Sequence, residues 1–262
     1  MAEPATERPT PVLETRALTK HYGGVRALEG ADLAIAPGEQ VAIVGDNGAG
    51  KSTFVRGISG VERPTSGSVL VGGAEMSFAA PAEARAAGIE TVYQDLALAG
   101  HLDVPANIFL GREIHRMRLG PLSWLDKRRM REEAERLLAR TGIKIPDMSQ
   151  PLMRLSGGQR QSVAITRAAG WGSRLIIMDE PTAALGVQET QKVEEIIRGL
   201  RGSDTAVLMV SHNLRQVFDL VDRVVVFRRG RIVGDRRTAD ASAEDIVALI
   251  TGADAGSELA HV

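Results

Sequence analysis

A glycine loop between a strand and a helix constrains this chain more than any other sequence feature. The apolar run Gln40–Val44 is typical of a buried strand, and the apolar residues of Phe54–Ile58 have helical spacing. Between them the sequence reads Gly45-Asp46-Asn47-Gly48-Ala49-Gly50-Lys51-Ser52-Thr53, which matches Gly-x-x-x-x-Gly-Lys-[Ser/Thr] in its required context. Glycines and a helix N-terminus offer backbone N–H groups to phosphate. The loop predicts a cradle in which Lys51 reaches the β- and γ-phosphates and Ser52 ligates Mg²⁺.

A second motif places two carboxylates at the end of an apolar strand. Leu175–Met178 is followed by Asp179, Glu180 and Pro181. Ligands of parallel sheets bind at the carboxyl ends of the strands, so this position favours function. Neighbouring side chains leave a strand in different directions. We therefore expect Asp179 to face a metal and Glu180 to activate the attacking water.

A third motif, Leu155-Ser156-Gly157-Gly158-Gln159-Arg160, places Ser-Gly-Gly at the start of a helix and offers a second phosphate site. Many phosphate-loop families share the first two motifs, so they do not fix the function. With the third motif, the chain resembles the ATP-binding subunits of ABC transporters. The resemblance extends from Leu13 to about Gly252.

The resemblance implies roles for further residues. Tyr22 matches the aromatic residue that stacks on adenine, and Gln94 matches the glutamine that touches the metal and moves with the nucleotide. His212 matches the histidine that contacts the γ-phosphate and orients the attacking water. In the family, ATP lies between the phosphate loop of one subunit and the signature of another, so Ser156 would contact the γ-phosphate held by the opposite Lys51. The implied cofactors are ATP and Mg²⁺.

The expected site residues form three sets. The catalytic set is Glu180, His212 and Lys51, and the metal set is Ser52, Gln94 and Asp179. The nucleotide set is Tyr22, Gly45, Asp46, Asn47, Gly48, Ala49, Gly50, Lys51, Ser52, Thr53, Gln94, Ser156, Gly157, Gly158 and Gln159.

The order of apolar strands and amphipathic helices predicts an α/β fold with a largely parallel sheet. Strand signals vanish from Asp95 to Gln150, where Lys127–Arg140 has helical spacing, which indicates an inserted helical subdomain. The resemblance also implies that the fold contains a phosphate-loop NTPase core and an N-terminal antiparallel β subdomain. The expected boundaries are a flexible arm at 1–10, an ATPase domain at 11–252 and a tail at 253–262. Within the domain, the core covers about 11–94 and 165–252, and the helical subdomain about 95–164.

Three stretches narrow the resemblance to simple-sugar importers of the ribose, xylose and fructose type: Val92–Leu98, Asn107–Glu113 and Pro181–Val187. One phosphate loop and one signature are present, so the resemblance implies a homodimer. It also implies a membrane permease, an indirect sugar-binding protein outside the membrane and a place on the cytoplasmic face of the inner membrane. The residues after Gln94 would receive a short helix of the permease. No residue selects a sugar.

The chain departs from the family pattern at one loop position. The family usually carries aspartate after Ser-Ala-Leu, whereas this chain reads Ala183-Ala184-Leu185-Gly186. The loop lies across the dimer interface in the family. We therefore expect Gly186 to loosen the link between the two ATP sites.

Composition excludes several other classes of protein. The 32 basic and 33 acidic residues give a net charge of -1, which offers no electrostatic case for nucleic acid. Zero cysteines exclude disulfides, thiolate zinc sites, iron-sulfur clusters and a cysteine nucleophile. The apolar runs are far shorter than the ~20 residues that cross a bilayer.

Two alternatives remain at this stage. A soluble ABC ATPase of DNA repair or translation would use the same ATP machinery, usually with coiled-coil, zinc or second-unit insertions. A phosphate-loop phosphotransferase would need an acceptor pocket and no signature.

Overall fold

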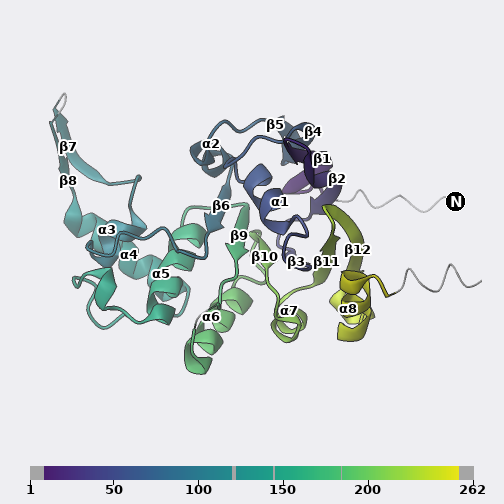
Figure 1. Cartoon of the computed structure of the whole chain (residues 1–262). Helices are drawn as coiled ribbons and strands as arrows, with labels where there is room; N and C mark the ends of the chain where they lie inside the picture. The colour runs from purple at the N-terminus through teal and green to yellow at the C-terminus, as the bar shows by residue number, and fades with distance from the viewer. Residues whose placement is uncertain (1–8, 120–121, 144, 184, 254–262) are drawn as a thin grey trace, which may run out of the picture. The chain divides into compact units, whose positions relative to one another are not determined.

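The computed structural model describes residues 9–119, 122–143, 145–183 and 185–253 (Figure 1). Their contacts define two compact units. The first unit comprises the described parts of Met1–Glu90, Arg174–Ile177 and Arg201–Val262, and the second those of Thr91–Ser173 and Met178–Leu200. The expected arm at 1–10 and tail at 253–262 lie almost wholly outside the described residues. The expected domain boundaries stay a prediction.

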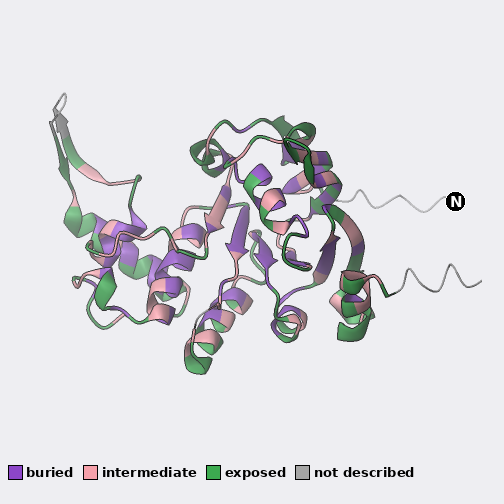
Figure 2. Ribbon diagram, in the orientation of Figure 1, coloured by how far each residue is buried: buried purple, intermediate pink, exposed green. Residues whose placement is uncertain are grey.

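A six-stranded sheet carries the phosphate loop. Its strand order is β12-β11-β3-β10-β9-β6. The strands are β3 (Gln40–Val44), β6 (Ile89–Val92), β9 (Leu175–Asp179), β10 (Ala206–Val210), β11 (Arg223–Arg228) and β12 (Arg231–Arg237). Strand β3 pairs in parallel with β10 and β11, whereas β12 is antiparallel to β11. All residues of β3 and β10 are buried, which explains the apolar runs Val41–Val44 and Ala206–Val210 (Figure 2).

A second sheet of the first unit is antiparallel and has the order β2-β1-β4-β5. Its strands are β1 (Leu13–Tyr22), β2 (Val25–Ile35), β4 (Ser66–Val71) and β5 (Ala74–Met76). Gly72 and Gly73 form the turn that joins β4 to β5, with Val71 opposite Ala74. The predicted fold class, with its mainly parallel core and N-terminal antiparallel β subdomain, is confirmed.

Four helices belong to the first unit: α1 (Lys51–Ile58), α2 (Pro81–Ala86), α7 (Leu214–Leu220) and α8 (Ala243–Thr251). A short 3₁₀ helix, Thr238–Asp240, precedes α8. The helix after the phosphate loop is anchored by Phe54, whose ring centroid lies 5.4 Å from that of Phe227 on β11. Both side chains are fully buried. This packing fixes α1 against the sheet that positions the loop.

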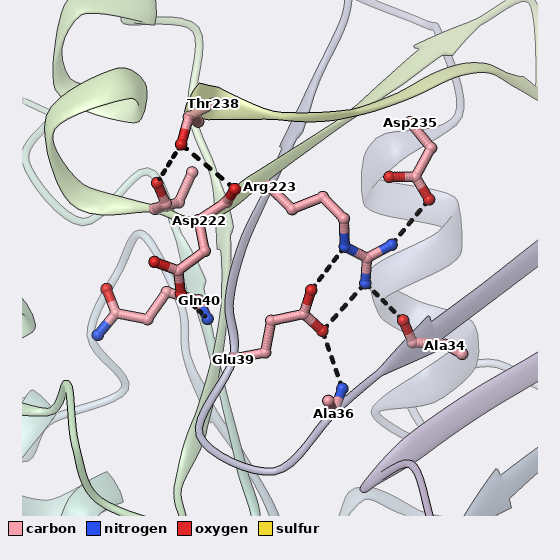
Figure 3. Close-up of polar contacts among 9 residues, drawn as sticks. Ala34, Ala36, Glu39, Gln40, Asp222, Arg223, Asp235 and Thr238 are labelled. Atoms are coloured by element: carbon pink, nitrogen blue, oxygen red, sulfur yellow. Dashed lines mark hydrogen bonds and ion pairs between the residues drawn. The ribbon is translucent and has the colours of Figure 1, made fainter. Parts of the chain in front are cut away.

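An arginine network ties the edge of the sheet to the start of β3 (Figure 3). The Arg223 guanidinium donates to Glu39 at 2.6 and 3.1 Å, to Asp235 at 2.7 Å and to the Ala34 carbonyl at 2.5 Å. Glu39 also accepts the Ala36 N–H at 2.9 Å. Burial is the largest single influence on the pKa of Arg223 and lowers it. The carboxylates of Glu39 and Asp235 together outweigh burial, so the pKa of Arg223 is raised.

The second unit is mainly helical. Its helices are α3 (Val104–Ile108), α4 (Lys127–Arg140), α5 (Gly157–Ala169) and α6 (Val187–Gly199), with a 3₁₀ helix at Leu152–Arg154. A separate hydrophobic core joins α3, α4 and α5. At its edge the rings of Phe109 and Trp171 meet edge to face at 5.0 Å.

The expectation that strands are absent from Asp95 to Gln150 is wrong. A hairpin of β7 (His115–Leu119) and β8 (Leu122–Leu125) lies within that stretch, with Met117 opposite Trp124. Both side chains are exposed, at 53% and 55%. Among the hairpin residues whose burial the structure describes, 115–117 and 123–125, none is buried, so they lack the alternation of buried and exposed residues by which a half-buried strand is recognised.

In the described part of the chain, every helix is too short or too polar to cross a lipid bilayer.

Candidate functional site

Two glycines of the phosphate loop are required by their surroundings. Gly45 follows β3 with φ of 144°, and a Cβ atom there would collide with the Phe227 carbonyl oxygen. Gly50 has φ of 105°, and a Cβ atom would lie 2.8 Å from the Ala27 carbonyl oxygen. Any side chain at either position would strain the backbone and displace a neighbouring strand or loop. The glycines of the motif thus serve the close packing of the loop against β11 and β2.

The start of α1 offers amide groups to an anion. Gly50 is its N-cap and provides no side-chain cap, and the first turn contains no acidic residue. The first N–H groups of a helix have no intrahelical acceptor, and the helix dipole favours a negative charge there. The Lys51 ammonium donates to the carbonyls of Gly45 and Asp46 at 2.6 and 2.8 Å. Its charge therefore lies inside the loop, where a phosphate would meet it.

Tyr22 lies at the end of β1 beside the first turns of α1. Its hydroxyl donates to Glu62, and the Lys20 ammonium lies 5.2 Å from its ring centroid. Partial burial, followed by the Glu62 carboxylate, raises the pKa of the phenol. The ring is 42% exposed, so part of it remains open to stack on a planar group.

His212 follows β10 at the same sheet edge as the phosphate loop. Val210 lies opposite Ile43 in the parallel pairing, and the Ser211 N–H donates to the Ile43 carbonyl at 3.3 Å. The next residue, Asn213, accepts the Gln216 N–H at 3.3 Å and caps α7. His212 is exposed. The first unit therefore brings together the phosphate loop, Tyr22 and His212.

The paired carboxylates belong to the second unit. Asp179 ends β9 and is half-buried, as is Glu180. The backbone of Glu180 is left-handed, with φ of 50°, and its carbonyl accepts the Ala183 N–H at 3.1 Å. A non-glycine residue in this conformation costs about 1–2 kcal/mol. Such strain is common where a side chain must be aimed at a reacting group.

The signature opens α5 with a complete capping box. The Gln159 side chain accepts the Ser156 N–H at 2.9 Å, and the Ser156 hydroxyl oxygen accepts the Gln159 N–H at 3.3 Å. Ser156 is exposed, Gly157 is half-buried and Gly158 is buried. The expected serine and glycines thus form an ordered helix N-terminus.

Gln94 is exposed after β6 and precedes a strained turn. Leu96 and Ala97 have φ of 62° and 44°, a conformation that side chains other than glycine rarely adopt. The Arg167 guanidinium on α5 donates to their carbonyl oxygens at 3.2 and 3.1 Å. Arg167 was not predicted from the sequence, because its acceptors lie 71 and 70 residues away and no local motif marks it.

Two further residues were missed. Asn107 is fully buried and bonds through its amide to Ala99, Leu102 and Asp103, so it shapes the segment after Gln94. Glu189 accepts the Gly186 N–H at 3.2 Å. A glutamate three residues after a helix N-cap is a recognisable capping-box spacing, so this contact was open to prediction.

Sequence comparison places these features in a known family. The sequence model described as ABC transporter matches residues 28–183, more than half of the chain. The fructose import ATP-binding protein FrcA of Rhizobium meliloti is 44% identical, with 93% of this chain and 95% of that protein covered. The chain belongs to the ABC transporter family.

Other relatives agree with this assignment. The xylose/arabinose import ATP-binding protein XylG of Sulfolobus acidocaldarius is 42% identical, with 92% of this chain and 94% of that protein covered. Ribose import ATP-binding protein RbsA 2 of Rubrobacter xylanophilus is 43% identical over 92% of this chain, which spans 46% of that protein. Family membership makes this chain an ATP-binding and ATP-hydrolysing protein.

Solved structures show the same fold. A dimeric ATP-binding cassette in a post-hydrolysis state, bound to ADP and Pi, has a TM-score of 0.72 and 25% identity, covering 86% of this chain and 98% of that chain. The cbiO1 protein of Clostridium perfringens, part of the ABC transporter complex cbiONQ, has a TM-score of 0.75 and 25% identity, covering 95% and 99%.

Proposed function

We propose that this chain hydrolyses ATP to drive the import of a simple sugar through a membrane permease. The observation that carries the proposal is its similarity, over more than nine tenths of both chains, to fructose and xylose/arabinose import ATP-binding proteins. The proposal includes a membrane permease and a sugar-binding protein outside the membrane. It also includes a peripheral position of this chain on the cytoplasmic face of the inner membrane.

The phosphate loop would hold the nucleotide. Backbone N–H groups of Gly45–Thr53 and the dipole of α1 face the phosphates, and Lys51 exchanges its two carbonyl contacts for phosphate oxygens. Tyr22 stacks on adenine with its exposed face.

The expected metal ligands suit Mg²⁺ because Ser52, Gln94 and Asp179 all offer oxygen donors. Bound Mg²⁺ would neutralise charge on the β- and γ-phosphates. Ser52 is exposed in the first turn of α1, and Asp179 ends an apolar strand.

Hydrolysis would depend on residues at the ends of strands. Glu180 accepts a proton from the attacking water, and His212 contacts the γ-phosphate and keeps that water in line. Lys51 stabilises the negative charge on the transferring phosphoryl group. The left-handed backbone of Glu180 aims its carboxylate independently of Asp179.

A second copy of the chain would complete each site. The Ser156 hydroxyl and the amides of Gly157, Gly158 and Gln159 would contact the γ-phosphate held by the partner. A solved dimeric cassette of the same fold supports this arrangement.

A pocket in the second unit offers a place for the permease. It encloses about 560 Å³ and lies between α3, α4 and β8, with Leu102, Pro105, Leu110 and Met130 among its apolar walls. His101, Asp103, Lys127 and Arg131 supply polar groups. An apolar floor with a charged rim fits a short amphipathic helix.

The rival function in DNA repair or translation is not favoured, because two relatives matched over more than nine tenths of both chains are import ATP-binding proteins. The phosphotransferase alternative is disfavoured by the signature helix.

Reconstitution tests the proposal. The chain and ATP are enclosed in proteoliposomes that carry a candidate sugar permease, and the matching sugar-binding protein is added outside. Uptake of labelled fructose, xylose and ribose is then measured. We expect uptake of at least one sugar, and its loss with Lys51→Ala, which removes the charge-assisted phosphate contact. ATP hydrolysis without uptake of any sugar would contradict the substrate class. Uptake that survives Lys51→Ala would contradict the role of the phosphate loop.

A further inference from the structure

The β7–β8 hairpin is a ribbon that projects from α3 and α4 of the second unit (Figure 1). Its two strands form a sheet of their own. A two-stranded hairpin is at best marginally stable in water unless something packs against one of its faces. A surface that covers one face of this ribbon would therefore stabilise it.

The hairpin exposes large apolar side chains side by side. Met117 on β7 lies directly opposite Trp124 on β8, and both side chains are more than half exposed. Directly opposite residues of an antiparallel pair project from the same face, with Cβ atoms about 5 Å apart. Met117 and Trp124 thus form one apolar patch. Adjacent exposed side chains of this size, unlike isolated ones, indicate an interaction surface.

Three basic side chains flank the apolar patch along the chain. Arg116 directly precedes Met117, and Lys127 and Arg129 lie in the first turn of α4, just after β8. All three are exposed. Within the part of the chain that the structure describes, none of the three forms an ion pair. Their charges are therefore available to an anionic partner.

Acidic side chains of this region are already engaged. Glu113 accepts a backbone N–H at 3.0 Å, Asp126 accepts that of Arg129 at 3.0 Å, and both are half-buried. Further along α4, Glu132 and Glu135 pair with arginines of the same helix at 2.9 and 3.2 Å. Residues 111–129 contain six basic and two acidic residues, although the net charge of the chain is -1. The exposed surface around the apolar patch is therefore positively charged.

We infer that the apolar patch and its basic flanks lie on an anionic lipid surface. Tryptophan is enriched where membrane meets water because its ring is apolar and its N–H is polar. Lysine and arginine beside a membrane are attracted to anionic headgroups. Two apolar side chains bury far less than the ~1,000 Å² of a specific protein interface, but they suit shallow insertion among headgroups. Charge and apolar area together favour lipid over a protein partner.

The hairpin adjoins the pocket proposed for the permease. Leu125 on β8 and Lys127 at the start of α4 both line that pocket. The ribbon would therefore meet the membrane beside the permease and add a second attachment to the one in the pocket. The lipid contact goes beyond the proposed function, because it requires neither nucleotide nor permease.

The fluorescence of Trp124 tests this contact. The chain has two tryptophans, and the other, Trp171, meets Phe109 edge to face. Trp171→Phe leaves Trp124 as the single probe in the full chain. Vesicles of phosphatidylcholine, with or without phosphatidylglycerol, are added while emission is recorded. With phosphatidylglycerol we expect a shift to shorter wavelength, because the ring leaves water, and its reversal by high salt, which screens the cations.

Variants in the same Trp171→Phe background separate the apolar and the basic contributions. Met117→Ser and Arg116→Gln should each raise the lipid concentration for the half-maximal shift about fivefold, through lost apolar burial and lost headgroup attraction respectively. Met76→Ser, exposed on β5, and Arg140→Gln, exposed at the end of α4, are the matched controls. Both controls should leave that concentration unchanged.

Three results would overturn the inference: no shift with phosphatidylglycerol vesicles, an equal shift with phosphatidylcholine alone, or equal effects of the test and control variants. A shift seen only in nanodiscs that contain the permease would assign the ribbon to a protein partner and overturn it too. Thermal melting shows whether Trp171→Phe stays folded; if it does not, co-flotation of the unmodified chain with the same vesicles replaces fluorescence. The vesicles hold neither permease nor ATP, so the outcome is independent of sugar import.

Discussion

Arg223 is a partly buried cation that holds in place the start of β3, the strand that leads into the phosphate loop. Its side chain is 17% exposed and bonds to two carboxylates and one carbonyl drawn from β2, the turn before β3 and β12. Glu39, which precedes β3, is held both by Arg223 and by the Ala36 N–H. The network thus fixes where the strand begins that ends at Gly45.

We predict that Arg223→Met lowers the free energy of unfolding by about 2 kcal/mol, because it leaves the half-buried Glu39 carboxylate without its charged partner. Urea denaturation monitored by circular dichroism measures the change. Arg231→Met is the matched control, since Arg231 pairs with Glu29 while its side chain is 62% exposed. The control should lose less than about 0.5 kcal/mol. Equal losses in the two variants would contradict the importance of the network.

At the residue scale, sequence motifs identified groups expected to meet the nucleotide but not the side chains that position them. Glu39 and Arg223 are 184 residues apart, so their ion pair exists only through the strand order β11-β3. The bonds from Arg167 to Leu96 and Ala97 are likewise not visible in the sequence, because only the fold brings these residues together. Contacts of this kind follow from tertiary structure and have no local pattern.

At the element scale, α5 joins two parts of the expected site. Its first residues are the signature glycines, and Arg167 in its last turn bonds to the turn after Gln94. That turn contains two consecutive left-handed residues, each costing about 1–2 kcal/mol. The guanidinium offsets this strain. A movement of α5 would therefore be transmitted to the segment that borders the proposed permease pocket.

We predict that Arg167→Met frees this turn. Amide hydrogen exchange of residues 95–100, followed by mass spectrometry, should accelerate about tenfold, because the loss of about 1.4 kcal/mol of local stability corresponds to that factor. The ratio of transport to hydrolysis should fall in the reconstituted system. Arg140→Met, exposed at the end of α4, is the control and should change neither quantity. Unchanged exchange in Arg167→Met would show that the turn is held by other contacts.

Elements with a continuous buried run were predictable, and exposed ones were not. Strands β3 and β9 match the expected apolar runs closely because both faces of the parallel sheet are covered. Hairpin β7–β8 was missed because Met117 and Trp124 lie opposite each other on an exposed face. Helix α3 has five residues, too few to show a helical period.

At the scale of the whole molecule, the expected site divides between the two units. The phosphate loop, Tyr22 and His212 belong to the first, whereas Gln94, the Asp179–Glu180 pair and the signature belong to the second. The first unit carries one of the three motifs and the second unit carries two, and the three together identified the family. They do not place the domain boundary, since the strands β6 and β9 are each divided between the units.

The most direct test of a composite ATP site is nucleotide-driven dimerisation of Glu180→Gln. The amide retains the shape of the side chain but cannot accept the proton of the attacking water, so ATP should stay bound between two copies. Size-exclusion chromatography with light scattering, run with and without Mg-ATP, measures the assembly, and phosphate release measures turnover. The account predicts a dimer only with Mg-ATP and no detectable turnover. A monomer in Mg-ATP, or phosphate release near the wild-type rate, would contradict it.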